Sequence, residues 1–232
     1  MAITVMQRVE MKYLLSAEQT DYLRGRLKGH MEADGYGKTS IASLYYDTPT
    51  YQLIRASVEK PPFKEKIRLR SYGIATDESP VYLELKRKAF GIVYKRRVET
   101  TVPLVAKFFS GEGDICAQGQ INREITAFRD FYKVLVPACM IIYDRTAYFE
   151  PGGDLRLTID EDPRYRVDDL TLKKSMDGIS LLGEGRTILE IKVQEAMPLW
   201  LAGILSDGGI RQGSFSKYGE AYRQQLAKAQ TI

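Results

Sequence analysis

The sequence predicts an α+β fold: a mostly antiparallel β-barrel of about eight strands, with a charged interior that forms a tunnel and with helices flanking it. Three observations lead to this fold class. The predicted strands are long and mostly joined by short turns that contain Gly or Pro, as is typical of antiparallel sheets. The predicted helices are few and peripheral. Most of the predicted strands also alternate between apolar residues and Lys or Arg.

The segment Lys64–Arg70 shows this alternation most clearly. Side chains on a β-strand alternate between its two faces, so four cations share one face and follow each other along roughly 20 Å. These cations are Lys64, Lys66, Arg68 and Arg70. The other face carries Glu65, Ile67 and Leu69. A row of like charges repels itself, so we expect an anionic partner: carboxylates of facing strands, solvent counterions or a polyanionic ligand.

The same alternation recurs in other predicted strands. Their charged faces are expected to carry Tyr82, Glu84, Lys86 and Lys88; Lys95 and Arg97; Tyr143 and Arg145; Asp154, Arg156, Thr158 and Asp160; and Glu190 and Lys192. An antiparallel sheet with one face in water would explain each strand taken separately. A solvated face usually mixes Thr, Ser and Gln with its charges, whereas these faces carry Lys or Arg almost throughout. We therefore favour a sheet curled into a barrel with its charged face inward.

The N-terminal half begins with a strand at residues 4–14. Next, Ser16-Ala-Glu-Gln19 has the spacing of a capping box and predicts a helix that ends at about Lys28. A second strand is expected at Ser40–Tyr46, and Asp47-Thr-Pro49 then starts a turn and a short helix. Three further strands, separated by turns with Gly and Pro, are expected at about 63–71, 79–88 and 92–101.

The C-terminal half begins with helical patterning over residues 103–133, interrupted by Gly111-Glu-Gly-Asp. A Pro-Gly-Gly-Asp turn joins the next two predicted strands, and a polar loop precedes the last one. These strands are expected at about 138–149 and 154–161, at 164–167 and at 187–193, and two helices follow at about 197–206 and 215–228. No repeat, low-complexity segment or linker interrupts the pattern, so residues 1–232 are expected to form a single domain.

The composition is that of a globular protein with local basicity. The chain has 232 residues, of which 44% are hydrophobic and 28% charged, and its net charge is only +4. Cations concentrate in Lys60–Arg70 and Lys86–Arg97, which indicates a site rather than a general field for nucleic acid. Cys116 and Cys139 lack CxxC spacing, which favours a reducing compartment. With no signal-peptide pattern and no apolar run of membrane-spanning length, the chain is expected to be cytoplasmic.

Several classes of site are disfavoured. The single histidine, His30, lies in a polar stretch typical of a helix end, which argues against Ser-His-Asp or Cys-His catalysis and against a His-rich zinc site. No motif of a P-loop or a Rossmann site is present. RNA binding is disfavoured because the cations would face inward and no RNP-like motif occurs. Tyr45, Tyr46 and Trp200 are expected to be core or rim aromatics.

The chemistry of the remaining groups indicates a phosphate ligand. Arg presents a planar fork that binds phosphate at two points, and Lys adds point charges. The carboxylates Glu10, Glu84 and Glu190 lie among these cations and can coordinate Mg²⁺ or Mn²⁺, which bridges phosphate oxygens. The combination predicts a triphosphate or polyphosphate ligand, and a tunnel suits a linear chain.

A series of short motifs follows along the chain: Glu10-Met-Lys12, Leu44-Tyr-Tyr-Asp-Thr-Pro49, Lys66-Ile-Arg-Leu-Arg-Ser-Tyr72, Leu83-Glu-Leu-Lys-Arg-Lys88, Tyr143-Asp-Arg145, Leu155-Arg-Leu-Thr-Ile-Asp160, Leu189-Glu-Ile-Lys192 and Phe215-Ser-Lys-Tyr218. Together they resemble the VTC domain, the polyphosphate polymerase domain of the vacuolar transporter chaperone complex. That domain is part of the CYTH, or triphosphate tunnel metalloenzyme, superfamily. The resemblance covers about residues 7–222.

The resemblance implies roles for individual residues. It implies phosphate binding by Lys12, Arg68, Arg70, Lys86 and Lys95, and further by Arg145, Arg156 and Lys217 with Tyr143 and Ser216 beside them. It also implies metal binding by Glu190. The candidates for phosphoryl transfer are thus Lys12, Arg68, Arg70, Arg145, Arg156 and Lys217. The candidates for holding substrate are Lys66, Lys86, Lys95, Arg97, Tyr143 and Ser216, and those for a metal are Glu190, Glu10 and Glu84.

One departure from the wider superfamily bears on the activity. Many members begin with Glu-x-Glu-x-Lys, but Arg8 stands at the first Glu position here. This disfavours an adenylate cyclase or triphosphate hydrolase and favours the VTC branch. The resemblance implies a metal-dependent polymerase that transfers the γ-phosphoryl group of a nucleoside triphosphate to polyphosphate. A triphosphate or polyphosphate hydrolase and a non-enzymatic polyphosphate binder stay open as alternatives, as do a separate membrane partner and the oligomeric state.

Overall fold

The computed structural model describes residues 9–59, 61–90, 92–115, 119–194 and 196–229. Arg8, Lys60, Cys116 and the first part of the strand predicted at 4–14 lie outside the described residues. The chain divides into two compact units, each built from three segments. The first unit comprises residues 1–40, 143–163 and 180–216, and the second comprises residues 41–142, 164–179 and 217–232.

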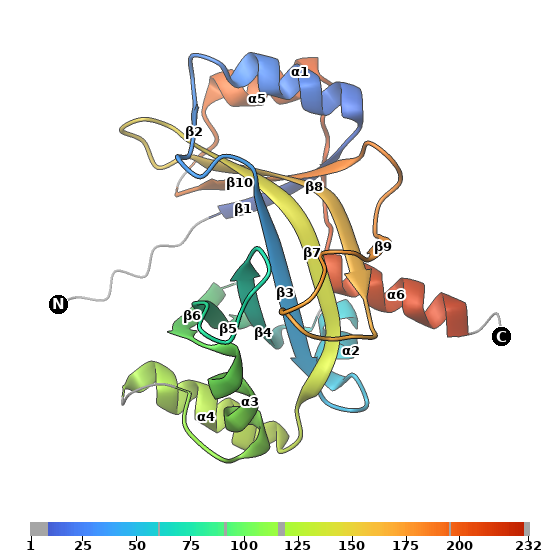
Figure 1. The fold of residues 1–232 in the computed structure, drawn as a ribbon. Coiled ribbons are helices and arrows are strands. Elements are labelled where there is room, and N and C mark those ends of the chain that lie inside the picture. Colours follow the sequence, from blue (N-terminus) through green and yellow to red (C-terminus); the bar gives the residue numbers. More distant parts are fainter. Residues whose placement is uncertain (1–8, 60, 91, 116–118, 195, 230–232) are drawn as a thin grey trace. The chain divides into compact units, whose positions relative to one another are not determined.

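The described residues form eleven strands and six helices, which confirms the α+β class (Figure 1). The strands are β1 (Val9–Leu15), β2 (Glu32–Ala33), β3 (Thr39–Asp47), β4 (Phe63–Tyr72), β5 (Val81–Ala89), β6 (Ile92–Thr100), β7 (Val136–Phe149), β8 (Arg156–Arg166), β9 (Ile179–Ser180), β10 (Thr187–Val193) and β11 (Gln212–Gly213). The helices are α1 (Ala17–Leu27), α2 (Gln52–Glu59), α3 (Val102–Ser110), α4 (Gln120–Tyr132), α5 (Leu199–Asp207) and α6 (Lys217–Ala229).

The strands form a large antiparallel sheet. Within the first unit, neighbouring strands follow the order β11-β1-β10-β8-β7, and in the second unit they follow the order β7-β3-β4-β5-β6. The predicted closed barrel of about eight strands is wrong: in the described part of the chain the strand path is open and ends at β11 and β6. Alternation reports the two faces of each strand, and these faces are the same in an open sheet and in a barrel. The sequence pattern therefore does not distinguish the two.

In the first unit, α1 and α5 pack on the apolar face of the sheet. The core here includes Leu23 and Leu27 of α1, Leu201 and Leu205 of α5, and Leu157, Leu189 and Ile191 of the strands. The predicted capping box starts α1: the backbone N–H of Gln19 donates to Ser16 Oγ at 3.2 Å, and that of Ser16 donates to Gln19 Oε1 at 3.1 Å. His30 follows this helix and stacks on Trp200, with ring centroids 4.3 Å apart.

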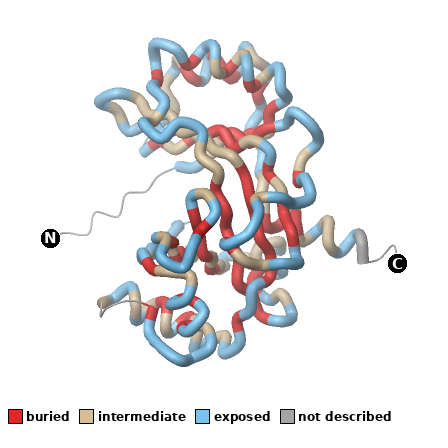
Figure 2. The backbone as a smooth tube through the Cα atoms, viewed as in Figure 1, coloured by how far each residue is buried: buried red, intermediate tan, exposed pale blue. Residues whose placement is uncertain are grey.

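In the second unit, α2, α3 and α4 cover the apolar face of β3, β4 and β5. Buried residues run along these strands (Figure 2) and include Leu44, Tyr46, Ile67, Leu69, Leu83 and Leu85, packed against Leu53, Phe108 and Phe128 of the helices. Glu65 lies on the same face as Ile67, as predicted, and it accepts hydrogen bonds from Arg87 Nε at 2.7 Å and the Tyr132 hydroxyl at 2.8 Å. Apart from Arg87, the cations of β4 and β5 are therefore left on the opposite face.

Most predicted elements are confirmed, with ends that differ by about two residues. The separate strand predicted at 164–167 is wrong, because β8 runs without a break through Pro163 to Arg166. Asp162 takes a positive φ of 43°, a local irregularity of the backbone after which the strand continues. The two-residue strands β2, β9 and β11 are not predicted, since two residues are too few to show a period.

No helix among the described residues combines the length and the apolar character needed to cross a membrane. The single-domain organisation stays a prediction.

Candidate functional site

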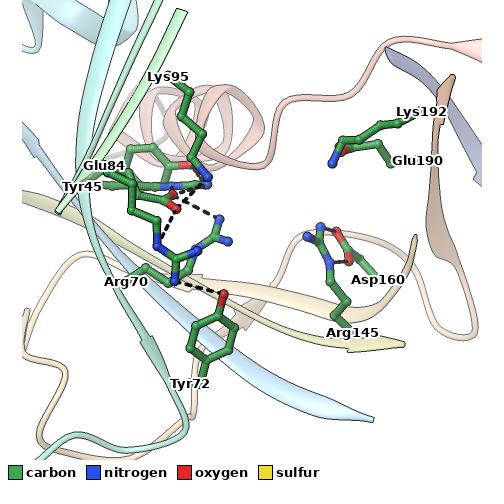
Figure 3. A network of polar contacts seen from close by, with 11 residues as sticks. Tyr45, Arg70, Tyr72, Glu84, Lys95, Arg145, Asp160, Glu190 and Lys192 are labelled. Carbon is green, nitrogen blue, oxygen red and sulfur yellow. Dashed lines mark hydrogen bonds and ion pairs between the residues drawn. The ribbon is translucent and has the colours of Figure 1, made fainter. Parts of the chain in front are cut away.

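The second unit carries a group of cations around one buried carboxylate, which we name the Glu84 cluster: Glu84, Arg68, Arg70, Lys95 and Arg97. Figure 3 labels Glu84, Arg70 and Lys95 of this cluster. Strand pairing sets Arg68 of β4 opposite Glu84 of β5, and Glu84 opposite Arg97 of β6. Residues directly opposite each other in an antiparallel sheet share one face. The predicted charged faces of these three strands are thus confirmed, and their register assembles the cluster.

The four cations lie at ion-pair distances from the Glu84 carboxylate. Arg68 Nη2 is 2.8 Å from Oε2, and Arg68 Nε donates to the same oxygen at 2.9 Å. Lys95 Nζ is 2.8 Å from Oε1. Arg70 Nη2 and Arg97 Nε are farther away, at 3.5 and 3.9 Å. Glu84 itself is only 2% exposed, so these cations replace the water that a carboxylate would otherwise bind.

One carboxylate does not neutralise four cations, so the Glu84 cluster carries excess positive charge. Burial by itself would raise the pKa of Glu84, but Arg68, Arg70 and Lys95 outweigh burial and lower this pKa to about 2. Arg70 is 7% exposed, and its Nε finds no hydrogen-bond acceptor in the described part of the chain. A buried donor on a charged group is costly to leave without an acceptor. The cluster can therefore accommodate a further anionic acceptor.

A row of lysines lies next to the Glu84 cluster. Lys66, Lys86 and Lys95 stand opposite one another on β4, β5 and β6. Like charges in such a register repel each other, and the row extends the basic face along the strands. Arg96 lies on the other face, where its Nε donates to Glu124 at 2.8 Å. The prediction that Lys95 and Arg97, rather than Arg96, belong to the charged face is confirmed.

Two tyrosines complete this face, and the sequence predicts neither of them as a site residue. Tyr45 lies opposite Arg68, whose Nη1 donates to the Tyr45 hydroxyl at 2.9 Å. Arg97 Nη2 donates to the Tyr72 hydroxyl at 3.5 Å. Tyr45 is 4% exposed, which confirms it as a buried aromatic, but its polar end lies among cations. The sequence signal that could have identified Tyr45 is the alternation of the strand, because Leu44 lies on the apolar core face and Tyr45 therefore lies on the opposite face.

The first unit carries a mixed cluster, which we name the Glu190 cluster: Glu10, Lys12, Glu190 and Lys192. The pairing of β1 with β10 sets Lys12 opposite Glu190 and Glu10 opposite Lys192. Lys12 Nζ is 3.4 Å from both Glu10 Oε1 and Glu190 Oε2, and Lys192 Nζ is 2.6 Å from Glu190 Oε1. Burial would raise the pKa of Glu190, but Lys192 and Lys12 outweigh it and hold this pKa far below its usual range. Glu190 is therefore ionised at neutral pH.

Arg145, also in the first unit, forms a two-point ion pair with Asp160 (Figure 3). Arg145 Nε is 2.5 Å from Asp160 Oδ1, and Nη2 is 2.8 Å from Oδ2. The guanidinium lies over the Tyr143 ring, 5.1 Å from its centroid, which confirms the predicted neighbourhood of these two residues. Arg156 lies opposite Lys192, and its Nη1 donates to the Leu155 carbonyl at 3.0 Å.

The last two predicted site residues are neighbours in the sequence and are assigned to different units. Ser216 is the final residue of the first unit, and Lys217 is the first residue of α6 in the second. Both are partly buried.

The predicted metal ligands differ in how well their surroundings suit a divalent cation. In the described part of the chain, no group of three or more His, Cys, Asp or Glu is placed to hold a metal ion. The cations around Glu84 disfavour a metal there. Glu190 and Glu10 fit better, because Thr158, opposite Glu190, adds a buried hydroxyl that has no hydrogen-bond partner among the described residues. Mg²⁺ and Mn²⁺ accept such oxygen ligands when phosphates and water complete the shell.

Comparisons with known proteins agree on family and fold. The profile of the VTC domain matches residues 7–226. A candidate adenylate cyclase from Bacillus halodurans superposes with a TM-score of 0.56 and 15% identity, covering 90% of this chain and 93% of that chain. A candidate adenylyl cyclase from Hippeastrum, described as having a dominant triphosphatase activity, gives a TM-score of 0.52 and 18% identity, covering 91% and 93%. The search of curated proteins returned no match.

At these identities the solved structures establish the fold alone, which this chain shares with the two candidate cyclases. The family profile extends over both units and includes every residue of the Glu84 and Glu190 clusters. The chain therefore belongs to the VTC domain family.

Proposed function

We propose that this chain is a metal-dependent polyphosphate polymerase, which transfers the γ-phosphoryl group of a nucleoside triphosphate to the end of a polyphosphate chain. Membership of the VTC domain family supports this function. The observation that carries it is the Glu84 cluster, where four cations surround one carboxylate. The Nε of Arg70 has no acceptor among the described residues and would be available to a ligand oxygen.

A phosphate chain matches the charge pattern of this face. Arg68 and Arg70 offer guanidinium donors with the geometry of phosphate oxygens. The row of Lys66, Lys86 and Lys95 adds point charges along one direction. Every internal phosphate of a polyphosphate chain is anionic, so a linear ligand can neutralise the Glu84 cluster and the lysine row at once.

The proposed reaction asks little acid–base chemistry of the protein. A terminal oxygen of the polyphosphate attacks the γ-phosphorus, a P–O bond forms, and the bond to the β-phosphate oxygen breaks as the nucleoside diphosphate leaves. The attacking oxygen is already anionic, so no strong base is required. The protein must mainly align the groups and neutralise charge on the transferred phosphoryl oxygens.

The Glu190 cluster would serve this charge neutralisation. Glu190 and Glu10 are the residues proposed to hold Mg²⁺ or Mn²⁺, which would supply positive charge against the negative charge of the phosphates. Lys12 and Lys192 keep Glu190 ionised. Arg145 is oriented by its two hydrogen bonds to Asp160. A guanidinium has five N–H donors, so the donors that do not bind Asp160 can bind phosphate.

The experiment that tests this function incubates the purified chain with ATP and Mn²⁺ and separates the products on a gel that resolves polyphosphate length. Long polyphosphate together with ADP supports a polymerase. Orthophosphate without polyphosphate overturns it in favour of a hydrolase, and tight binding of polyphosphate without turnover overturns it in favour of a binder. A parallel reaction with a chelator tests the metal requirement, since a polymerase that is equally active with chelator contradicts it.

Arg70→Gln is expected to weaken the binding of inorganic polyphosphate roughly tenfold or more, because a hydrogen bond to a charged group contributes about 1.5–3 kcal/mol. The dissociation constant is measured by titration at constant salt, since phosphate contacts depend on ionic strength. Arg96→Gln is the matched control, because Arg96 pairs with Glu124 on the opposite face. Wild-type affinity in Arg70→Gln, or equal loss in both variants, would contradict the role of Arg70.

A further inference from the structure

Tyr45 is a neutral side chain in direct contact with the guanidinium of Arg68, and Figure 3 shows Tyr45 beside Glu84. Its hydroxyl accepts a hydrogen bond from Arg68 Nη1 at 2.9 Å, while Arg68 Nε and Nη2 contact Glu84. The guanidinium carbon of Arg68 and the Nζ of Lys66 lie 5.7 and 6.0 Å from the centre of the Tyr45 ring. Glu84 and Tyr45 therefore both orient Arg68.

The Tyr45 ring also contacts α6. Tyr218 stacks on Tyr45 with ring centroids 4.5 Å apart, and the Tyr218 hydroxyl donates to Asp47 Oδ2 at 3.0 Å. Asp47 is fully buried and accepts backbone hydrogen bonds from Thr48 and Leu53 at 2.8 Å each. Tyr45 therefore has little freedom to move away from Arg68.

The charges that face Tyr45 favour its ionised form. Burial would raise the pKa of Tyr45, but Arg68, Lys66 and Arg70 of β4 outweigh burial and lower this pKa to about 8. From α6 the ring is faced by Tyr218, whose own pKa is raised by burial and by Asp47. Glu84 of β5 contacts the same Arg68 guanidinium as Tyr45 does.

We propose that Tyr45 is a positioning residue of the Glu84 cluster: as a neutral phenol it holds the Arg68 guanidinium toward a bound phosphate, and as a phenolate it competes with that phosphate for Arg68. The proposal rests on the proposed function, because it assumes that the cluster binds phosphate. When Tyr45 ionises, its proton goes to solvent. When a polyanion binds, the phenolate takes up a proton from solvent.

The sign of the resulting pH dependence follows from linkage. The cations stabilise the phenolate, and a bound polyanion offsets those cations, so binding favours the protonated Tyr45. Affinity for polyphosphate is then full below pH 8 and falls as the pH rises through about 8. For complete competition the fall between pH 7 and pH 9 is about tenfold, since each pH unit above the pKa removes about tenfold of the protonated form.

The first test measures the ionisation of Tyr45 independently of polyphosphate binding. Tyrosinate formation is followed by ultraviolet absorbance during a pH titration of wild type, Tyr45→Phe and Tyr72→Phe. Tyr72→Phe is the matched control, because Arg70 and Arg97 also lower the pKa of Tyr72. The step near pH 8 should be absent in Tyr45→Phe and present in Tyr72→Phe, and its persistence in Tyr45→Phe overturns the proposal. Lys66→Gln should move the step to higher pH, because it removes one of the stabilising cations.

The second test measures the dissociation constant of inorganic polyphosphate between pH 7 and pH 9. The ratio of wild type to Tyr45→Phe is compared at each pH, which cancels the titration of the ligand and of the lysines. Tyr45→Phe keeps the ring that stacks on Tyr218, so the variant should fold. A ratio that changes by several-fold, up to about tenfold, supports the proposal, and a constant ratio overturns it. If neither protein binds polyphosphate, the proposed function fails, and the absorbance titration still decides whether Tyr45 ionises near pH 8.

Discussion

Replacing Glu84 by Gln is expected to lower the free energy of unfolding by about 3 kcal/mol, because removal of one partner of a buried ion pair leaves uncompensated charge. Here Arg68, Arg70, Lys95 and Arg97 would face one another without the only carboxylate that the described residues place among them. This value is at the lower end of the losses that are usual when a buried ion pair is broken. We expect the lower end because water reaches part of the Glu84 cluster, where the Lys95 side chain is 46% exposed. Equilibrium unfolding in denaturant measures the loss.

Glu124→Gln is the matched control for this prediction. Glu124 pairs with Arg96 on the opposite face of the same unit, so its loss should cost far less. Inorganic polyphosphate should raise the melting temperature of Glu84→Gln by more than that of wild type, since the ligand replaces the missing negative charge. Glu84→Gln with wild-type stability, or with no additional stabilisation by polyphosphate, would show that the four cations do not depend on this carboxylate.

The difference in stability between wild type and Glu84→Gln is also expected to depend on pH. The pKa of Glu84 falls from 4.5 to about 2 on folding. A carboxylate with a lowered pKa stabilises the folded protein fully above its unfolded pKa, and this contribution is lost as the pH falls through the folded value. The difference in stability between wild type and Glu84→Gln should therefore be largest above about pH 4.5 and shrink toward pH 2.

The second large effect is expected at Glu190. Under the proposed function, Glu190→Gln should reduce turnover of ATP by roughly 100-fold or more, the size of effect found when one electrostatic group that acts on the transition state is removed. Polyphosphate affinity should change far less, because the Glu84 cluster stays intact. Initial rates of ADP release with Mn²⁺, measured well below the melting temperature of the variant, give the turnover.

Glu161→Gln is the control for the loss of a carboxylate in the same unit. Glu161 forms ion pairs with Arg24 at 2.8 Å and Lys38 at 3.4 Å, outside the Glu190 cluster, so its variant should keep wild-type turnover. Full turnover in Glu190→Gln would refute metal binding there. A wild-type protein that binds polyphosphate but shows no turnover of ATP would instead indicate a binding module, in which Glu190 has no catalytic part.

Local signals in the chain predict the elements well. The capping box of Ser16 and Gln19 marks the start of α1, and β10 has the predicted bounds 187–193. The alternation over Lys64–Arg70 separates the buried Ile67 and Leu69 from the cations on the other face. These features depend on a few neighbouring residues, because capping is an exchange of hydrogen bonds within one turn and alternation is a property of one strand.

The sequence by itself therefore determined which residues of each strand are charged and which are buried, and the family motifs indicated what the charges bind. Tertiary structure decided their partners: Glu84 with four cations, Arg145 with Asp160, and Tyr45 with Arg68. It also decided that the strand path stays open in the described part of the chain. The physical reason is that alternation has a period of two along one strand, whereas ion pairs and closure depend on the register between strands. Strand register is set by turns and packing far along the chain, which no single strand encodes.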